Sequence, residues 1–304
     1  MTSAALSWGC GLLAFGPTAS LLFLLAYQKA QLIIVVTTSA FAFLLSALFA
    51  SMVWWIFDTV GLDLGGVVIL LPGVLFQFLM RCYFVSIYHK VEKVIETSIE
   101  QHAQQVQQQQ QSTQNGEAAN DGEETWTESA RLRLELNDWS CGLAAGTGFG
   151  GMHAFLLYGT LLASEAGNLG TLYQDSCPGI PSLLVSALNA FFFSILDIIW
   201  MLLTFFGMRR RAQADGEEVE ISHGFGAMLG NTRGSGTNAL LLCLGTHLLA
   251  SFSTTFTVAD NGCRASLPTL AAIVLGTVFV FVWGVSRTYL PLKQRRRVAG
   301  DHVE

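Results

Sequence analysis

The chain has 304 residues, of which 52% are hydrophobic and only 12% are charged, and its formal net charge is −6. Soluble globular domains usually contain about 25% charged residues, so the composition excludes an ordinary soluble domain and indicates a membrane protein. No part of the sequence is basic enough to indicate nucleic-acid binding, so no nucleic acid is expected as a partner.

Seven stretches of the chain are apolar over the roughly 20 residues that a spanning helix needs. Because backbone polar groups in lipid must be satisfied internally, and the alternating polarity of a barrel is absent, these stretches predict helices. We expect an all-α, polytopic membrane protein with a single domain over residues 1–304. The predicted spans are 5–26, 32–57, 66–89, 139–163, 182–207, 238–258 and 268–290.

The distribution of Lys and Arg predicts the orientation of the chain in the membrane. Of the 16 Lys and Arg residues, fourteen fall on one side of the predicted spans, Arg264 falls on the other, and Arg81 lies inside the third span. Cytosolic loops carry the excess of positive charge. We therefore expect the N-terminus to be lumenal or extracellular and the C-terminus to be cytosolic.

The longest loop, about 91–137, is cytosolic in this arrangement. It is rich in glutamine between Gln101 and Gln114, and an acidic stretch follows. Such a composition cannot bury enough apolar surface to order itself. We expect a disordered loop, with the third helix running on through Val94 and Ile99 before it frays.

The fourth span carries Gly142, Gly146 and Gly150 at intervals of four residues, which places them on one helix face. We call these three glycines the glycine ladder. Helices in lipid associate through close backbone contact, so this face predicts tight packing of another helix. The partner could be a helix of the same bundle, but we favour an assembly interface with another subunit.

Two ionisable residues of neighbouring spans lie at similar depth. Asp197 and His247 are roughly 15 and 14 Å from the cytosolic ends of their helices. Because a buried ionisable group in lipid is costly unless it is paired, we predict a hydrogen bond or ion pair between them. His153 lies roughly 7 Å off that level, so a metal site of His153, Asp197 and His247 is the less favoured alternative.

Gln77 and Arg81 stand one helical turn apart on the third span. Arg81 is about six residues from the predicted cytosolic end, near enough for its side chain to reach the interface. We expect both residues to have secondary polar roles.

The six cysteines show no spacing typical of zinc ligands. Most lie in apolar spans, where cysteine behaves as a small hydrophobic residue. Cys177 and Cys263 instead fall in loops predicted to be lumenal, a compartment that permits disulfides. We predict a disulfide between them that joins the loops 164–181 and 259–267.

Several blocks of the sequence have a recognisable pattern. The opening, Trp8–Pro17, is similar to F-G-C-x-x-x-A-F-G-P, and Leu244–Ser251 is similar to G-S-H-L-L-T-S. Together with the glycine ladder, these blocks resemble the anterior-pharynx-defective family, a subunit of γ-secretase. The resemblance covers essentially all seven spans, but Asp197 stands where the family has histidine.

The resemblance implies assembly rather than chemistry: a non-catalytic scaffold of the γ-secretase intramembrane aspartyl protease, which cleaves type I membrane proteins such as Notch and amyloid precursor protein. It implies presenilin, nicastrin and the presenilin-enhancer subunit as partners within membrane lipid. It places the protein in the endoplasmic reticulum, Golgi, plasma membrane and endosomes. The glycine ladder would serve assembly, and Asp197 with His247 would support packing and contact with presenilin. No catalytic residue, metal or cofactor is expected.

Two other classes of protein share features with this sequence. A G-protein-coupled receptor also has seven spans, but Arg81 lacks the preceding acidic residue, and the last span has no N-P-x-x-Y. The main alternative is a stand-alone intramembrane metal-dependent hydrolase using His153, Asp197 and His247. Bound metal would favour the hydrolase, whereas co-purification of nicastrin and presenilin would favour the scaffold.

Overall fold

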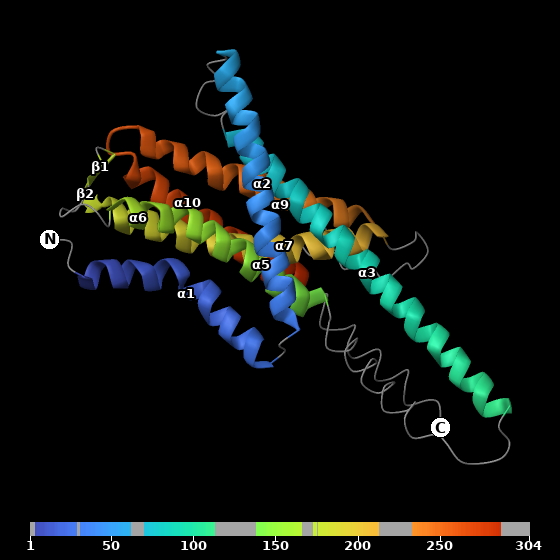
Figure 1. Cartoon of the computed structure of the whole chain (residues 1–304). Helices are drawn as coiled ribbons and strands as arrows, with labels where there is room; N and C mark the ends of the chain where they lie inside the picture. The colour runs from blue at the N-terminus through green and yellow to red at the C-terminus, as the bar shows by residue number, and fades with distance from the viewer. Residues whose placement is uncertain are drawn as a thin grey trace.

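The computed structural model describes residues 4–28, 31–61, 70–112, 138–165, 173–174, 176–212 and 233–286, which are almost wholly helical (Figure 1). A short antiparallel pair, β1 (Tyr173–Gln174) and β2 (Cys177–Pro181), precedes α7 and was not predicted. The helical elements are α1 (Ala4–Gln28), α2 (Leu32–Val60), α3 (Leu70–Ser112), α5 (Asp138–Ala154), η1 (Phe155–Gly159), α6 (Thr160–Glu165), α7 (Ser182–Ala212), α9 (Arg233–Thr255), η2 (Phe256–Val258), α10 (Cys263–Val280) and η3 (Phe281–Ser286).

The predicted all-α membrane fold is confirmed in the described residues. Five helices are long and apolar enough to cross a membrane, and the remaining two predicted spans correspond to α9 and to the continuous unit α5–η1–α6. That unit is interrupted by a π-helical turn, a local widening of the helix that often marks functional regions. The five candidate spans are Ala5–Leu25, Leu32–Val60, Leu70–Ile95, Ser182–Ala212 and Cys263–Gly284.

The third helix is longer than predicted. It continues to Ser112, so the first part of the expected disordered loop 91–137 is helical, and residues 113–137 lie outside the described residues. Glutamine and glutamate are good helix formers. A helix that is already nucleated in the membrane can also be extended without the cost of starting a new one. In Figure 1 the end of α3 projects away from the other helices.

The core of the bundle is built around α7. Between Phe193 and Phe206 this helix is mostly apolar and buried almost throughout, with Asp197 as its one ionisable residue, and it contacts α1, α3, α5, α9 and α10. A helix that is hydrophobic all round is buried by its neighbours. Figure 1 shows α5, α7, α9 and α10 running alongside one another, while α2 and α3 cross them at steep angles.

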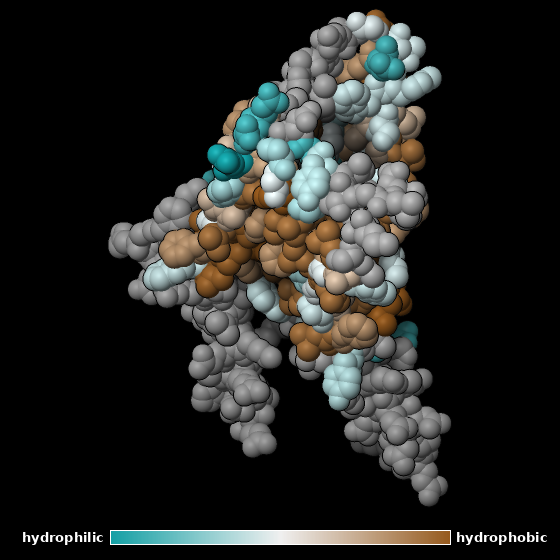
Figure 2. Space-filling view, turned by 90° about the vertical axis from the view of Figure 1, so that its left-hand side faces the viewer, coloured by the Kyte–Doolittle hydropathy of each residue, from teal (hydrophilic) through white to brown (hydrophobic). Residues whose placement is uncertain are grey.

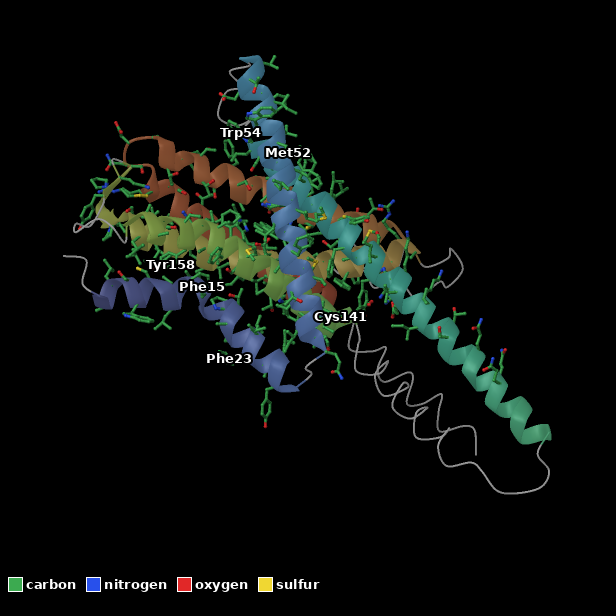
Figure 3. All side chains as sticks on the ribbon, viewed as in Figure 1. Phe15, Phe23, Met52, Trp54, Cys141 and Tyr158 are labelled. Carbon is green, nitrogen blue, oxygen red and sulfur yellow. A yellow bond between two sulfur atoms is a disulfide. The ribbon has the colours of Figure 1, made fainter. Side chains whose placement is uncertain are left out.

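The first helix is bent in its middle. The bend lies beside Phe15, which faces Tyr158 of η1 (Figure 3) at a ring-centroid distance of 5.9 Å. Pro17 lies inside α1, and a proline there removes a backbone hydrogen bond and bends a helix. Among the coloured residues of Figure 2, hydrophobic ones cover a broad area and hydrophilic ones gather in patches, as expected for a bundle surrounded by lipid.

Candidate functional site

The glycine ladder of α5 packs directly against the backbone of α7. An ideal Cβ added at Gly146 would lie 2.6 Å from the Cα atom of Ile198, closer than real Cβ atoms approach. The two backbones can therefore touch only because the ladder has no side chains. The three contacts are Gly142 with Leu202, Gly146 with Ile198, and Gly150 with Ser194.

The predicted docking of another subunit on this face is therefore corrected. The alternative use of this face, packing inside the bundle, is the observed one, because α7 of the same chain occupies the face. The opposite side of α5 is also filled: a Cβ at Gly148 would collide with Val36 and Ser39 of α2. Gly151 faces Thr18 of α1. These glycines of α5 therefore lie against three helices of their own chain, α1, α2 and α7.

Beside the ladder, four side chains from four helices form a buried polar cluster, which we call the charge cluster. The guanidinium of Arg81 on α3 donates a hydrogen bond to Oδ1 of Asp197 on α7. The second Asp197 oxygen lies 2.7 Å from Nδ1 of His153 on α5. Arg81 also donates to Nδ1 of His247 on α9, at 3.2 Å. The cluster thus links α3, α5, α7 and α9.

The charge cluster is buried inside the helix bundle. Arg81 and Asp197 are 0% exposed, His247 is 2% exposed and His153 is 9% exposed. A single buried charge would cost several kcal/mol, but Arg81 and Asp197 neutralise each other, and each also bonds to a histidine. Nε of Arg81 remains buried without a hydrogen-bond partner among the described residues.

The bonding pattern also assigns the histidine tautomers. Since arginine can only donate, Nδ1 of His247 carries no proton. Since a carboxylate only accepts, Nδ1 of His153 carries one.

Aromatic rings enclose the guanidinium. The Arg81 Cζ atom lies 4.9 Å from the ring centroid of Phe149 and 5.1 Å from that of Trp200. A cation over an aromatic face gains further electrostatic stabilisation when it is desolvated. Trp200 also stacks on His247 at 4.3 Å and donates its indole N–H to Thr246 at 2.8 Å. The rings therefore fix both the cation and the histidine that it contacts.

The cluster differs from the predicted pair in two ways. Asp197 and His247 are not bonded directly, because the Arg81 guanidinium lies between them and bonds to each. The expectation that Arg81 reaches the interface is wrong, since its side chain is fully buried. Gln77, one turn along α3, has a buried Oε1 atom with no hydrogen-bond partner in the described residues.

His153 reaches Asp197 although the sequence placed the two at different depths. In the antiparallel register of the ladder contacts, they are about six residues, or roughly 9 Å, apart along the helix axes. Cα–Cβ bonds tilt toward the N-terminus of their own helix, so side chains on antiparallel helices can lean toward each other. His153 and Asp197 do so. His153 follows Gly150 by three residues, and this continuation of the α7-facing side was the signal that could have revealed the contact.

The metal-dependent alternative is not supported by these donors. A cation held by His153, Asp197 and His247 would need the carboxylate and both imidazoles to converge. Instead, the Arg81 guanidinium bonds to both Asp197 and His247, and each Asp197 oxygen already has a partner. The residues present therefore suit a structural ion pair rather than a metal ion.

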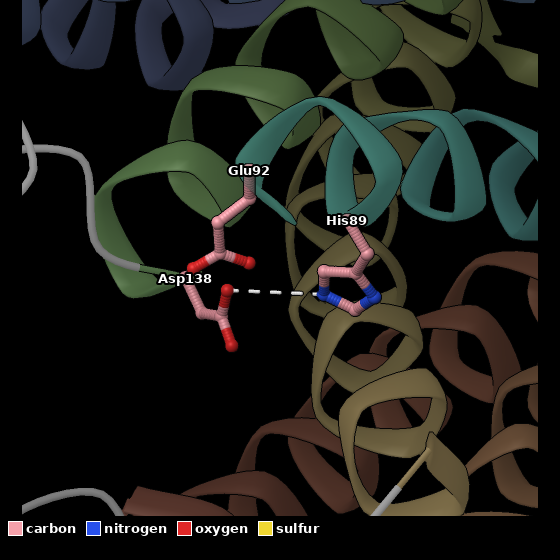
Figure 4. A group of neighbouring side chains, drawn as sticks. All are labelled: His89, Glu92 and Asp138. Carbon is pink, nitrogen blue, oxygen red and sulfur yellow. Dashed lines mark ion pairs between the residues drawn. The ribbon is translucent and has the colours of Figure 1, made fainter. Parts of the chain in front are cut away.

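A second polar group, unforeseen from the sequence, lies where α3, α5 and α7 meet (Figure 4). The side chains of His89, Glu92 and Asp138 offer ligand atoms within 4.8 Å of one another. Arg209, however, binds Asp138 through two hydrogen bonds of 2.7 and 2.6 Å and reaches Glu92 at 2.5 Å. Because Arg209 already bonds to both carboxylates, we interpret this group as a contact that joins α3, α5 and α7 rather than as a metal site.

The structure bonds Cys177 to Cys263, with their Cα atoms 5.5 Å apart. The backbone N–H of Cys263 also donates to the Ser176 carbonyl at 3.2 Å. This connection holds β2 against the start of α10, and it spans 86 residues of sequence.

We predict that the full-length chain, expressed in cells and alkylated before lysis, will lose this disulfide only under reduction. Non-reducing gels should show a faster band than reducing gels, because the closed loop is more compact. Changing either cysteine to serine should abolish the difference, whereas Cys10→Ser should leave it unchanged. Free labelling of Cys177 and Cys263 without a reductant would contradict the prediction.

The features described so far define a class: a polytopic membrane helix bundle whose buried polar residues join helices to one another. The sequence profile of the Aph-1 protein family matches residues 5–287. The chain belongs to this family, the non-catalytic scaffold subunits of γ-secretase. It is also 26% identical over 224 residues to a γ-secretase subunit APH1-like protein of Arabidopsis thaliana, covering 73% of this chain and 78% of that relative.

Proposed function

We propose that the chain forms a rigid membrane scaffold to which presenilin, nicastrin and the presenilin-enhancer subunit bind. Its complex would then cleave type I membrane proteins such as Notch and amyloid precursor protein. The observation that carries the proposal is that the buried polar side chains bond to one another within the chain. Arg81, His153, Asp197 and His247 of the charge cluster bond to one another inside the chain, although Nε of Arg81 has no hydrogen-bond partner among the described residues. The outer faces of the bundle are thereby left for lipid and partner helices.

The charge cluster would support presenilin contact indirectly in this account. It fixes the relative positions of α3, α5, α7 and α9, and the glycine ladder fixes the distance between α5 and α7. Partner helices dock well on surfaces that do not have to reorganise, because preorganisation lowers the cost of association. Substitutions inside the bundle should therefore weaken assembly by loosening the scaffold.

The orientation and location belong to the same proposal. We place the N-terminus in the lumen and the C-terminus in the cytosol of the endoplasmic reticulum, Golgi, plasma membrane and endosomes. Lys90, Lys93 and Arg211 are exposed near one end of the bundle, as expected for cytosolic segments. The Cys177–Cys263 bond lies in the segments predicted to be lumenal, and an oxidising lumen would maintain it.

The proposal is tested by tagging the full-length chain, solubilising membranes in a mild detergent and identifying the captured proteins by mass spectrometry. Presenilin, nicastrin and the presenilin-enhancer subunit are expected in the eluate, with protease activity toward a Notch-derived substrate. Arg81→Met should lose the partners, whereas the exposed control Arg211→Met should retain them. A wild-type chain that is purified at normal yield without any of the three would contradict the proposal.

A further inference from the structure

His153 is the most exposed member of the charge cluster. Its side chain is 11% exposed, whereas those of Arg81 and Asp197 are 0% exposed. Because its Nδ1–H donates to Asp197, Nε2 of the neutral imidazole carries no proton and can only accept a hydrogen bond. Nε2 forms no hydrogen bond within the described residues, and it is not one of their buried polar atoms that lack a partner. The open part of the side chain therefore includes Nε2.

The imidazole of His153 is held in one orientation. Its ring centroid lies 5.0 Å from that of Phe43 on α2 and 4.9 Å from that of Phe193 on α7. Asp197, which is itself bonded to Arg81, fixes the Nδ1 side of the ring. A carboxylate bonded to one imidazole nitrogen also makes the other nitrogen more basic. Nε2 is thus a strong acceptor at a fixed position, and a fixed acceptor binds its donor at a lower entropic cost.

The helices on either side of His153 do not close over it. Both α2 and α7 pack along α5, but they make no extensive contact with each other in the described ranges. In Figure 1, α2 crosses α5 and α7 at a steep angle, so the helices diverge away from the crossing point. A side chain from outside the bundle can therefore approach Nε2.

His153 lies near the middle of the membrane. Along the helix axis it stands roughly 22 Å from the start of α5 and roughly 18 Å from the end of α6, and a hydrocarbon core is about 30 Å thick. Lipid tails contain no hydrogen-bond donor, and headgroups are out of reach at this depth. Because polar side chains in membranes bond across helices, Nε2 favours a donor that another protein segment brings into the membrane.

The charges of the cluster restrict the chemistry of that donor. A lysine or arginine would approach the Arg81 guanidinium, which bonds to the same carboxylate as His153, and like charges repel strongly in a medium of low dielectric constant. A carboxylate can only accept, so it cannot bond to an unprotonated Nε2. Neutral donors remain: the hydroxyl of serine or threonine and the carboxamide of asparagine or glutamine, which join helices to one another in membranes.

We infer that Nε2 of His153 is a docking site for a neutral hydrogen-bond donor, a hydroxyl or a carboxamide, on a membrane segment of a partner subunit. The site adds a direct polar contact to the scaffold, beside the indirect effect of the charge cluster on its rigidity. The inference rests on the proposed scaffold function, because the partner segment belongs to one of the subunits that the chain binds.

The first test is the reactivity of His153 toward diethylpyrocarbonate, which modifies accessible, unprotonated imidazole nitrogens, measured by mass spectrometry. In the purified isolated chain, His153 is expected to react, whereas His247, which is 2% exposed, should stay unmodified. In the complete complex, the donor on Nε2 should slow the reaction of His153 about tenfold, the protection that one hydrogen bond in a membrane supports. This measurement uses the wild-type chain, so it does not depend on the folding of a variant.

The second test is the variant His153→Asn. The asparagine amide can replace Nδ1–H as the donor to Asp197, but it has no atom at the place of Nε2. The isolated variant is expected to unfold at nearly the wild-type temperature, while subunit capture per folded chain falls about threefold to tenfold. His153→Gln is the matched variant, because its amide reaches the place of Nε2 but leaves Asp197 without this partner. It should lower the unfolding midpoint more than His153→Asn does and keep more of the capture per folded chain.

Three results would overturn the inference. The first is an unreactive His153 in the isolated chain, which would mean that Nε2 is not accessible. The second is equal reactivity in the isolated chain and in the complex, which would leave Nε2 to lipid or water. The third is wild-type capture by His153→Asn. If the wild type captures its subunits and His153→Asn captures them equally, the inference alone fails, whereas a wild type that captures none contradicts the proposed function as well.

Discussion

Replacing Arg81 with methionine is expected to destabilise the protein by about 3–5 kcal/mol, the cost of leaving a buried charge without its partner. The carboxylate of Asp197 is 0% exposed and would keep only His153 as a partner. Thermal unfolding of the purified full-length chain, followed by size-exclusion chromatography after heating, measures the loss. Arg211→Met serves as the control, because it removes an exposed cation of the same type.

The double variant R81M/D197L sharpens this prediction. It removes both charges of the pair, so it is expected to be more stable than either single variant, even though His153 and His247 each lose a partner. Such strong non-additivity is typical of residues in direct contact. If the effects of Arg81→Met and Asp197→Leu simply add, the two residues are not energetically paired, and the charge cluster is not what joins these helices.

Replacing Gly146 with leucine is expected to separate α5 from α7. The Cβ alone would lie 2.6 Å from the Cα atom of Ile198, and neither backbone can move aside without displacing a buried helix. Overpacking of this kind costs about 1–3 kcal/mol and occasionally more, and backbone collision places Gly146→Leu at about 3 kcal/mol. The readout is the thermal unfolding midpoint of the chain in detergent.

Gly245 provides the matched control for this substitution. It also lies in a spanning helix, α9, but a Cβ there would have nothing within 4 Å. Gly245→Leu should therefore insert, fold and melt like the wild type. Equal destabilisation by Gly245→Leu and Gly146→Leu would show that leucine itself, rather than the contact between α5 and α7, causes the loss.

The fold could be predicted from the sequence because a lipid bilayer permits few backbone conformations. A long uncharged segment must be helical in a bilayer, so the predicted spans and the observed helices agree closely for α1, α2 and α7. The ends of the helices were predicted less accurately where only the amino-acid composition indicated them. The glutamine-rich stretch between Gln101 and Gln114 indicates disorder, yet α3 continues to Ser112, since a polar segment can remain helical when it grows from a spanning helix.

The candidate site could be predicted only in part, because a residue count gives depth along each helix separately. That count treats every helix as upright, whereas α3 is steeply inclined to α7 in Figure 1. Arg81 therefore lies at the centre of the bundle instead of at its edge. Tilt is set by packing against neighbouring helices, and packing partners cannot be read from one helix at a time.

The glycine ladder illustrates the same limit. Its spacing correctly indicated close helix contact, but spacing does not tell which helix makes the contact. Ser194, Ile198 and Leu202 of α7 recur at intervals of four residues, so the matching surface was present in the same sequence. Of these three positions only Ser194 is small, so the fifth span shows no small-residue pattern that would identify it as the partner of the glycine ladder.

The most direct test of this account is the unfolding of the isolated chain, without any other γ-secretase subunit, as wild type and as Gly146→Leu. If the ladder holds α5 against α7, the midpoint of the isolated variant will fall well below that of the wild type, and subunit capture will fall with it. If the isolated variant melts like the wild type while partner capture is lost, the ladder serves another subunit, and the internal packing described here is not its function.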